Sequence, residues 1–380
     1  MAQTTQQLTW PGVLAWRLTR QYLDRRATQR ETPGVVAEIC GLHAQVMSSA
    51  ELTLWARVED LDPEWVSEAL WERRSLAKTW AMRGTLHLLP ANELPVWVAA
   101  QGALKPRHHA GSWQRHFGLS YEEAEAMLVA IPEALDGKTL TREELAQEVG
   151  RLVDSEGLTD KLRDGFGALL KPSAFRGDLL FAPNLGQNVR FARPDQWLSD
   201  WEPAETEAAV REVARRYLAA YGPATREEFA RWFGANSPAQ AERIIKGLGE
   251  EVASVQVDGT HTWMLAEHIP EAEAAKPSGV VRLLPAFDHY TVAAPRDQEA
   301  VLPQTLKKRV YRPQGWLSPV LVVDGRMEGI WKHESKGERL VVEIEPFSEQ
   351  PEWVRRAAEE EAERLTRFLG GELELGWLAP

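Results

Sequence analysis

The 380-residue sequence predicts an α+β protein in which units of helices followed by a β-hairpin repeat along the chain, before a β-rich unit at the C-terminus. Three observations predict this class: a helix-initiating motif that occurs twice, a strand-rich run after each copy, and a change to strand-rich sequence beyond Glu271. At roughly 150 residues per domain, the chain is long enough for two to three domains.

The repeated motif, T-R-E-E-[Leu/Phe]-A, begins at Thr141 and again at Thr225. In each copy the threonine is a predicted N-cap, and a glutamate three residues later has the spacing of a capping box. An apolar residue, Leu145 or Phe229, then opens the buried face. Each copy therefore predicts the start of a short helix.

A predicted hairpin follows each copy, over residues 177–192 and 252–267, and Asp258-Gly259 is a two-residue turn in the second. Helices followed by a hairpin are typical of the winged helix, a helix-turn-helix variant. A weaker third copy has predicted helices between residues 13 and 71 and a strand-like run over 79–90. Tandem copies can form a scaffold, but their repetition favours nucleic-acid binding. The predicted domains are three winged helices, over 1–100, 101–200 and 201–270, and a β-rich unit over 271–380.

The C-terminal unit combines strands with one helix. Residues 283–298 and 315–334 are strand-rich, and Asp324-Gly325 gives a second two-residue hairpin signal. Residues 353–368 predict an amphipathic, charged helix that packs back on the sheet.

Net charge argues against a nucleic-acid partner, but its distribution does not. The formal charge is −12, from 44 Lys and Arg against 56 Asp and Glu. Three stretches are nevertheless locally basic: residues 11–30, 105–116 and 304–316. Three such stretches on an acidic chain favour one electropositive surface, although each is also compatible with an ordinary solvated face.

Several classes of protein and site are not expected. No apolar run approaches the roughly 20 residues of a membrane helix, the first residues do not resemble a signal peptide, and the lone Cys40 suits a reducing compartment, so we expect a cytoplasmic protein. Phosphate-binding glycine loops and a serine nucleophile elbow are absent. His108, His109 and His116 have no cysteine nearby and no carboxylate at ligand spacing, so we expect no metal and no cofactor.

Two polar residues, His43 and Gln45, flank Ala44 in an otherwise apolar segment. Residues two apart on a helix point to different faces, so both serve one site only where the backbone is extended or a helix ends. The alternative, that they are capping groups or polar groups of the core, stays open on this evidence.

Five segments together resemble a known family. In order and spacing, the chain is similar to the AlkZ/YcaQ family of bacterial DNA glycosylases in the segments 42–45, 79–90, 215–234, 283–290 and 315–334. The resemblance implies three tandem winged helices around a DNA channel and monofunctional excision of N7- or N3-alkylpurines in base-excision repair. Some members unhook interstrand crosslinks. The implied partner is double-stranded DNA carrying alkylated bases, and we expect a monomer.

The family's catalytic signature is a glutamine, an apolar residue, and a glutamine or aspartate. Here the triplet is His43-Ala44-Gln45, so Gln45 matches and His43 departs from the pattern. An N7-alkylated purine is a cationic leaving group, so the enzyme needs only to position water, which Gln45 orients while His43 holds it or accepts its proton. Because of His43, a catalytically silent DNA-binding protein or regulator is the alternative. A protein-interaction scaffold is a third reading, which the acidic net charge favours.

Other basic residues are candidates for contacts with DNA. Arg83 contacts a phosphate or pairs with a carboxylate within its own unit. Lys307, Lys308 and Arg309 form the core of one basic stretch. The Asp324-Gly325 hairpin resembles the family region from which a β-hairpin reaches toward the lesion, and its candidates are Arg326, Lys332 and His333. The alternative for these three residues is the solubility of an edge strand.

Overall fold

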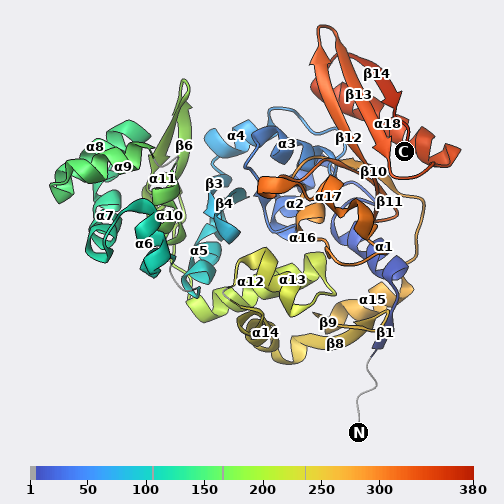
Figure 1. Ribbon diagram of the computed structural model, residues 1–380, viewed down its shortest axis with the longest axis horizontal. Coiled ribbons are helices and arrows are strands. Elements are labelled where there is room, and N and C mark those ends of the chain that lie inside the picture. The colour runs from blue at the N-terminus through green and yellow to red at the C-terminus, as the bar shows by residue number, and fades with distance from the viewer. Residues whose placement is uncertain (1–5, 105–106, 165–166, 236) are drawn as a thin grey trace. The chain divides into compact units, whose positions relative to one another are not determined.

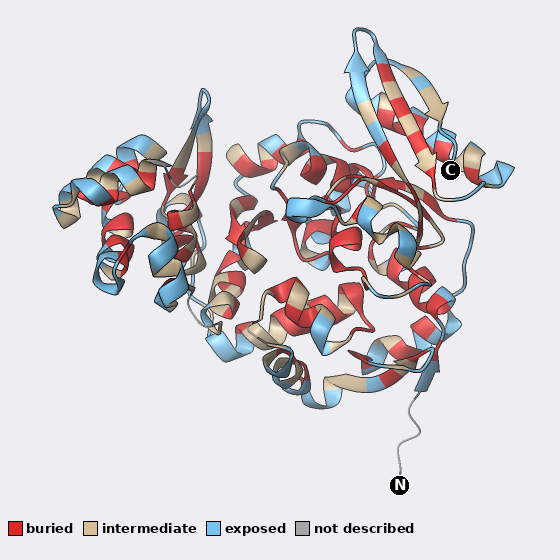
Figure 2. Ribbon diagram, viewed as in Figure 1, coloured by how far each residue is buried: buried red, intermediate tan, exposed pale blue. Residues whose placement is uncertain are grey.

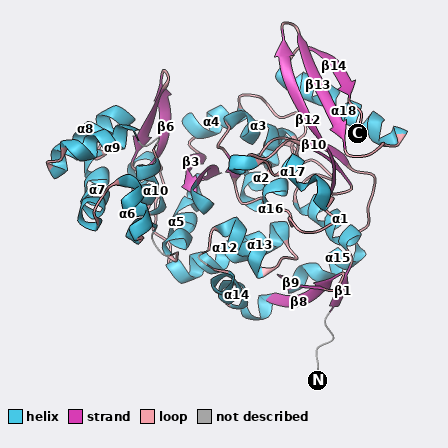
Figure 3. Cartoon of the chain, viewed as in Figure 1, coloured by secondary structure: helices cyan, strands magenta, loops and turns pink. Residues whose placement is uncertain are grey.

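A computed structural model describes residues 6–104, 107–164, 167–235 and 237–380, which contain both helices and strands (Figures 1 and 3). This mixed content agrees with the predicted class. The helices are α1 (Trp10–Arg20), α2 (Thr32–Glu38), α3 (Met47–Trp55), α4 (Trp65–Trp71), α5 (Leu94–Gly102), α6 (Gly111–Phe117), α7 (Tyr121–Ala134), α8 (Arg142–Val153), α9 (Glu156–Asp164), α10 (Lys171–Phe175), α11 (Pro194–Trp197), α12 (Thr206–Tyr221), α13 (Arg226–Phe233), α14 (Pro238–Lys246), α15 (Ile269–Ala274), α16 (His289–Ala293), α17 (Lys307–Val310) and α18 (Glu352–Leu369). The strands are β1 (Gln6–Leu8), β2 (Leu42–His43), β3 (Leu76–Ala81), β4 (Thr85–Pro90), β5 (Leu140–Thr141), β6 (Leu180–Leu185), β7 (Asn188–Ala192), β8 (Val252–Val257), β9 (Thr260–Leu265), β10 (Val281–Leu284), β11 (Val320–Val323), β12 (Arg326–Lys336), β13 (Arg339–Pro346) and β14 (Glu372–Trp377).

The chain forms two compact units. The first unit combines Met1–Val66 and Ala214–Trp232 with Ser237–Pro380, and the second comprises Ser67–Val213 and Phe233–Asn236. The segment that carries His43 therefore folds together with the C-terminal half of the chain.

The second unit is built on an antiparallel sheet in which five strands have the order β4-β3-β6-β7-β5. Its core includes Trp80, Ile131, Leu145, Phe181 and Phe191. The indole of Trp80 lies 4.7 Å from the ring of Phe181, centroid to centroid. The strands from 79–90 and 177–192, which the sequence predicts separately, thus share one core.

Both copies of the repeated motif form the predicted capping boxes. In α8, the Thr141 hydroxyl accepts from the Glu144 backbone N–H at 3.2 Å, and the Glu144 carboxylate accepts from the Thr141 N–H at 2.7 Å. At the start of α13, Thr225 and Glu228 make the same two bonds at 3.2 and 2.8 Å. The prediction of two helix starts is confirmed.

The predicted turn Asp258-Gly259 joins β8 to β9, with φ of 46° and 84° at its two residues. Both residues need a left-handed backbone, which Asp-Gly supplies at low cost. The N-terminal strand β1 pairs in parallel with β8 and completes a three-stranded sheet in the first unit.

The C-terminal sheet has the order β10-β11-β12-β13-β14, and α18 packs on it. Along β13, Leu340, Val342 and Ile344 are buried, whereas the strand residues between them are more exposed. Figure 2 shows that this alternation ends at the exposed tip of the β12–β13 hairpin. The predicted amphipathic helix over 353–368 is confirmed as α18.

The turn Asp324-Gly325 joins β11 to β12, as predicted, but it is packed inside the unit. A Cβ at Gly325 would lie 2.7 Å from the Cβ of Leu14, and the Tyr290 hydroxyl donates to the Gly325 carbonyl at 2.7 Å. Glycine is required here by both its φ of 85° and this close approach. Among the described residues, no helix combines the length and apolar character needed to cross a membrane.

Candidate functional site

The triplet His43-Ala44-Gln45 lies on non-helical backbone between α2 and α3. After α2 the chain reverses through Cys40 and Gly41, whose φ values are 65° and 87°, and then enters β2. Val46, at φ −121° and ψ 116°, is extended before α3 begins. Gln45 and Val46 form a bend, so the triplet lies outside a helix, with His43 buried and Gln45 exposed.

His43 belongs to a stack of aromatic rings. Its imidazole lies parallel to the ring of Phe287, at 5.0 Å between centroids and 5° between planes, and the His43 residue is only 5% exposed. The indole of Trp316 contacts the same phenyl ring at 5.2 Å and is 50% exposed. Gln45 is exposed, and the next residue, Val46, packs on the cluster that contains Phe287. The site thus combines a fixed imidazole, an exposed amide and an open indole surface.

Phe287 has a left-handed backbone, with φ of 60°. A bulky residue adopts this conformation only where its surroundings hold it there. The next residue, Asp288, supplies that constraint, since its side chain caps α16 by accepting from the Tyr290 N–H at 2.8 Å. The carboxylate is also half of a buried ion pair.

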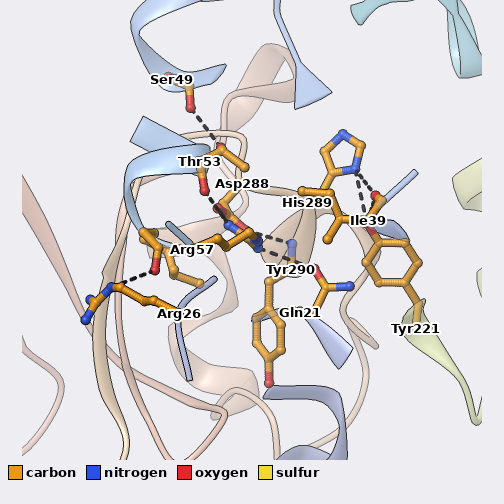
Figure 4. A network of polar contacts seen from close by, with 12 residues as sticks. Gln21, Arg26, Ile39, Ser49, Thr53, Arg57, Tyr221, Asp288, His289 and Tyr290 are labelled. Atoms are coloured by element: carbon orange, nitrogen blue, oxygen red, sulfur yellow. Dashed lines mark hydrogen bonds and ion pairs between the residues drawn. The ribbon is translucent and has the colours of Figure 1, made fainter. Parts of the chain in front are cut away.

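The ion pair joins Asp288 to Arg57, just beyond α3 (Figure 4). The guanidinium donates to both carboxylate oxygens, at 2.7 and 2.8 Å, and both side chains are fully buried. It also donates to the Thr53 carbonyl at 2.9 Å and to the Gln21 amide oxygen at 3.3 Å. Loss of one partner from a buried ion pair typically costs about 3–5 kcal/mol. The pair therefore ties Phe287 to the helix that follows Gln45.

A second set of buried contacts holds the backbone of Ile39, at the end of α2. The Tyr221 hydroxyl donates to the Ile39 carbonyl at 2.6 Å, and His289 Nδ1 lies 3.1 Å from both oxygens (Figure 4). Because a carbonyl only accepts, Nδ1 carries the proton of His289. Burial raises the pKa of Tyr221 well above its usual value, so the hydroxyl remains a donor. These bonds fix the residue that precedes the Cys40-Gly41 reversal.

The basic segment 307–309 forms α17 in the same unit. Lys307 pairs with Asp297, and Arg309 pairs with Glu345 at 2.6 Å. Lys308 is exposed, and within the described ranges no acidic side chain pairs with it. Tyr311, at the end of this segment, packs on the Phe287 cluster. The segment therefore adjoins the cluster that contains Phe287, and Lys308 is its exposed cation without an acidic partner among the described residues.

The three candidates on β12 have partners within the fold. Arg326 pairs with Glu328 at 2.6 Å, and Lys332 pairs across the strands with Glu343 at 2.5 Å. His333 stacks on a neighbouring indole, and burial lowers its pKa. These contacts lie on the surface of the sheet, in which β12 pairs with both β11 and β13 and is therefore not an edge strand.

Arg83 lies in the second unit, between β3 and β4, in a left-handed conformation with φ of 58°. It is half-buried and lines a cavity of about 540 Å³ together with Lys171 and Arg176. Arg83 therefore belongs to a basic wall of this cavity.

The sequence has no carboxylate at local ligand spacing from the histidines, but the fold brings one to them. Nε2 of His108 and Nε2 of His109 each lie 3.2 Å from Oε1 of Glu125. These three residues form a possible metal-ligand group, with all donor atoms within 4.8 Å of one another. Local spacing rules miss Glu125 because it comes from α7, 16 residues beyond His109. His116 is exposed, as expected, and Lys105 lies outside the described residues.

The sequence analysis missed Phe287, Trp316, Arg57 and Asp288 as parts of the site. Phe287 and Asp288 belong to LLPAFDHY, and Trp316 belongs to GWLSPV; the sequence marked these two segments as strand-rich and as similar to the family, but gave these residues no role. The ring contact and the ion pair depend on long-range packing, for which the sequence holds no local signal.

Comparisons with known proteins agree on a family. Residues 36–368 match the family described as DNA glycosylase AlkZ-like. The chain is 38% identical over 373 residues to an interstrand DNA cross-link repair glycosylase of Streptomyces sahachiroi, covering 95% of this chain and 97% of that protein. The solved structure of the Streptomyces sahachiroi DNA glycosylase AlkZ is similar at a TM-score of 0.86 and 37% identity, covering 98% of this chain and 100% of that one.

Proposed function

Because this chain belongs to the AlkZ-like family of DNA glycosylases, we propose that it acts as a monofunctional glycosylase on N7- or N3-alkylated purines in double-stranded DNA. One observation carries the proposal: His43 is fixed against Phe287 while Gln45, two residues on, is open to solvent. This arrangement suits a reaction that needs a positioned water molecule and no strong acid.

In the proposed reaction, water attacks C1′ of the deoxyribose as the bond from C1′ to the purine nitrogen breaks. The bonding electrons go to the purine, which neutralises the positive charge of the alkylated ring. The amide oxygen of Gln45 accepts a hydrogen bond from the water, and the imidazole of His43 accepts the proton that the water loses. Stacking on Phe287 fixes the plane of the imidazole, so the accepting nitrogen is held in place.

Trp316 provides a surface for the substrate in this proposal. Its indole is half exposed and contacts the ring of Phe287. Indole faces stack on nucleobases and on apolar faces of sugars. We assign Trp316 to contact with the damaged nucleotide or its neighbour.

The proposed DNA-binding frame is three winged helices, over 1–100, 101–200 and 201–270. Supporting this division, α7 to α9 precede the β6–β7 hairpin, and α12 to α14 precede the β8–β9 hairpin. The N-terminal copy has α1 to α4 before β3 and β4. Lys308 is the first cation we assign to a phosphate, because Lys307, Arg309, Arg326 and Lys332 have acidic partners.

Interstrand crosslinks are a second proposed substrate. The Streptomyces relative named for crosslink repair matches nearly the whole chain. A crosslink between N7 positions also makes each purine cationic, so the same water attack releases it. Activity on such a lesion needs no further catalytic group.

The test is base release from a duplex that carries a single N7-methylguanine, followed by alkaline cleavage at abasic sites. We expect release above spontaneous depurination, a loss of about 100-fold or more in Gln45→Ala, and a smaller loss in His43→Ala. Gln350→Ala, in the loop before α18, is the matched control and should equal the wild type. Salt-dependent DNA binding without release, from both this duplex and an N7-crosslinked one, would instead identify a catalytically silent DNA-binding protein.

A further inference from the structure

The second unit contains a cluster of titratable side chains on the wall of its 540 Å³ cavity. His108 and His109 end the short 3-10 helix Arg107–His109, which packs against α7, where Glu125 lies one turn from the start. All three side chains line the cavity. No step of the proposed glycosylase reaction uses this cluster.

The three donor atoms have the separations of a metal site. Each imidazole Nε2 lies 3.2 Å from Glu125 Oε1, and all three atoms lie within 4.8 Å of one another. Tetrahedral zinc, with bonds of about 2.0–2.1 Å to nitrogen and oxygen, separates its ligand atoms by about 3.3 Å. One ion therefore fits between these atoms with only small side-chain movements.

Neighbouring contacts hold the ligands in place. A capping box at Ser120 and Glu123, with bonds of 3.1 and 2.7 Å, fixes the start of α7. The Gln114 amide donates to the His108 carbonyl at 3.2 Å, and the rings of His108 and Trp113 lie 6.3 Å apart, centroid to centroid, at 72° to each other. Metal ligands are usually oriented by supporting contacts of this kind.

We propose that His108, His109 and Glu125 bind one divalent transition-metal ion of the zinc class and leave a fourth coordination position open to the cavity. Two histidines, one glutamate and a water molecule make a typical zinc site with an exchangeable position. Trp113 and Phe117 supply apolar wall elsewhere in the same cavity, and Arg176 supplies positive charge. The open position therefore takes water or an anionic oxygen donor.

A direct test measures zinc binding by the full-length chain after chelator treatment and dialysis, using titration calorimetry and elemental analysis. We expect one Zn²⁺ per chain. Glu125→Gln and His109→Ala should each weaken binding by about 100-fold or more, because even the loss of a supporting contact costs 10–100-fold. His116→Ala, an exposed histidine on the nearby α6, is the matched control and should bind as the wild type does.

Cobalt provides a second readout. Co²⁺ at the site should give the intense visible bands of a four-coordinate ion, and Glu125→Gln should lose them while thermal unfolding confirms that it folds. The alternative is that both imidazoles simply donate hydrogen bonds to Glu125. Absence of stoichiometric Zn²⁺, or binding that the Glu125 and His109 substitutions leave unchanged, would establish that alternative and overturn the proposal. Neither readout depends on base release, so the outcome is separate from that of the glycosylase proposal.

Discussion

The two units use histidine in opposite ways. In the first unit, His43 presents the face of its ring to Phe287, and the backbone on both sides is held by buried polar contacts. In the second unit, His108 and His109 direct their Nε2 atoms to a single carboxylate oxygen. A stacked ring is fixed in its plane, whereas nitrogens that converge on one oxygen suit a cation. The two proposed roles, water activation and metal binding, differ because His43 is contacted on the face of its ring, whereas His108 and His109 are contacted at Nε2.

The largest expected effect on stability comes from loss of the buried ion pair between Arg57 and Asp288. Asp288→Ala leaves the Arg57 guanidinium charged and buried without its partner, so we expect a loss of about 3–5 kcal/mol in the free energy of unfolding. Chemical denaturation monitored by circular dichroism measures it. Glu374→Ala, which removes an exposed ion pair with Arg339 at 2.6 Å, is the control and should change stability little. Equal effects of the two substitutions would show that the buried pair does not support the stack.

The second site predicts stabilisation by a ligand. At a free Zn²⁺ concentration 100 times Kd, the folded chain should gain about 2.7 kcal/mol, because the ion binds the folded state preferentially. The gain should be absent in Glu125→Gln and present in Gln45→Ala, since the latter changes only the first site. Thermal unfolding with and without Zn²⁺ measures it. A gain that survives in Glu125→Gln would place the ion elsewhere.

Replacement of Phe287 tests whether its ring holds the imidazole of His43 in place. Phe287→Leu keeps an apolar side chain under His43 but removes the flat surface, so we expect a loss of stability of about 1 kcal/mol. Base release should fall about 10-fold, because the imidazole is no longer held in one plane. Single-turnover rates and denaturation curves measure the two effects. Unchanged rates in a destabilised variant would mean that Phe287 serves packing alone.

The smallest effect concerns contact with the DNA backbone. Lys308→Ala should weaken duplex binding at every sequence and lower the slope of log K against log salt by about 1, as expected for one lost phosphate contact. Lys307→Ala should change the slope less, since Lys307 already pairs with Asp297. Fluorescence anisotropy at several salt concentrations gives both slopes. Identical slopes for Lys308→Ala and the wild type would remove Lys308 from the DNA surface.

Local rules predicted much of the fold. The capping boxes at Thr141 and Thr225 and the Asp-Gly turns depend on residues two or three positions apart, so the sequence contains all that determines them. His43 and Gln45 were also found, through two polar residues in an apolar segment and a family resemblance. The structure places them outside a helix, with His43 buried and Gln45 exposed, and both the shared site and their catalytic roles stay predictions.

Long-range contacts explain what the sequence could not predict. Arg57 and Asp288 are 231 residues apart, and the burial that makes their ion pair important exists only in the folded chain. The sequence alone did not indicate that Lys332 of β12 has an acidic partner, because Glu343 lies opposite it only in the register of β12 and β13. Glu125 was passed over for the same reason, because helix packing brings it to His108 and His109.

The proposal that Gln45 positions the attacking water is tested most directly by the single-turnover rate of base release from an N7-methylguanine duplex. This rate is measured for the wild type and Gln45→Ala, and the fraction of DNA bound is determined in the same samples. We expect a wild-type rate well above spontaneous depurination and a loss of about 100-fold or more in Gln45→Ala at unchanged DNA affinity. Equal rates for the two proteins would contradict the proposal, since the water would then be positioned by another group.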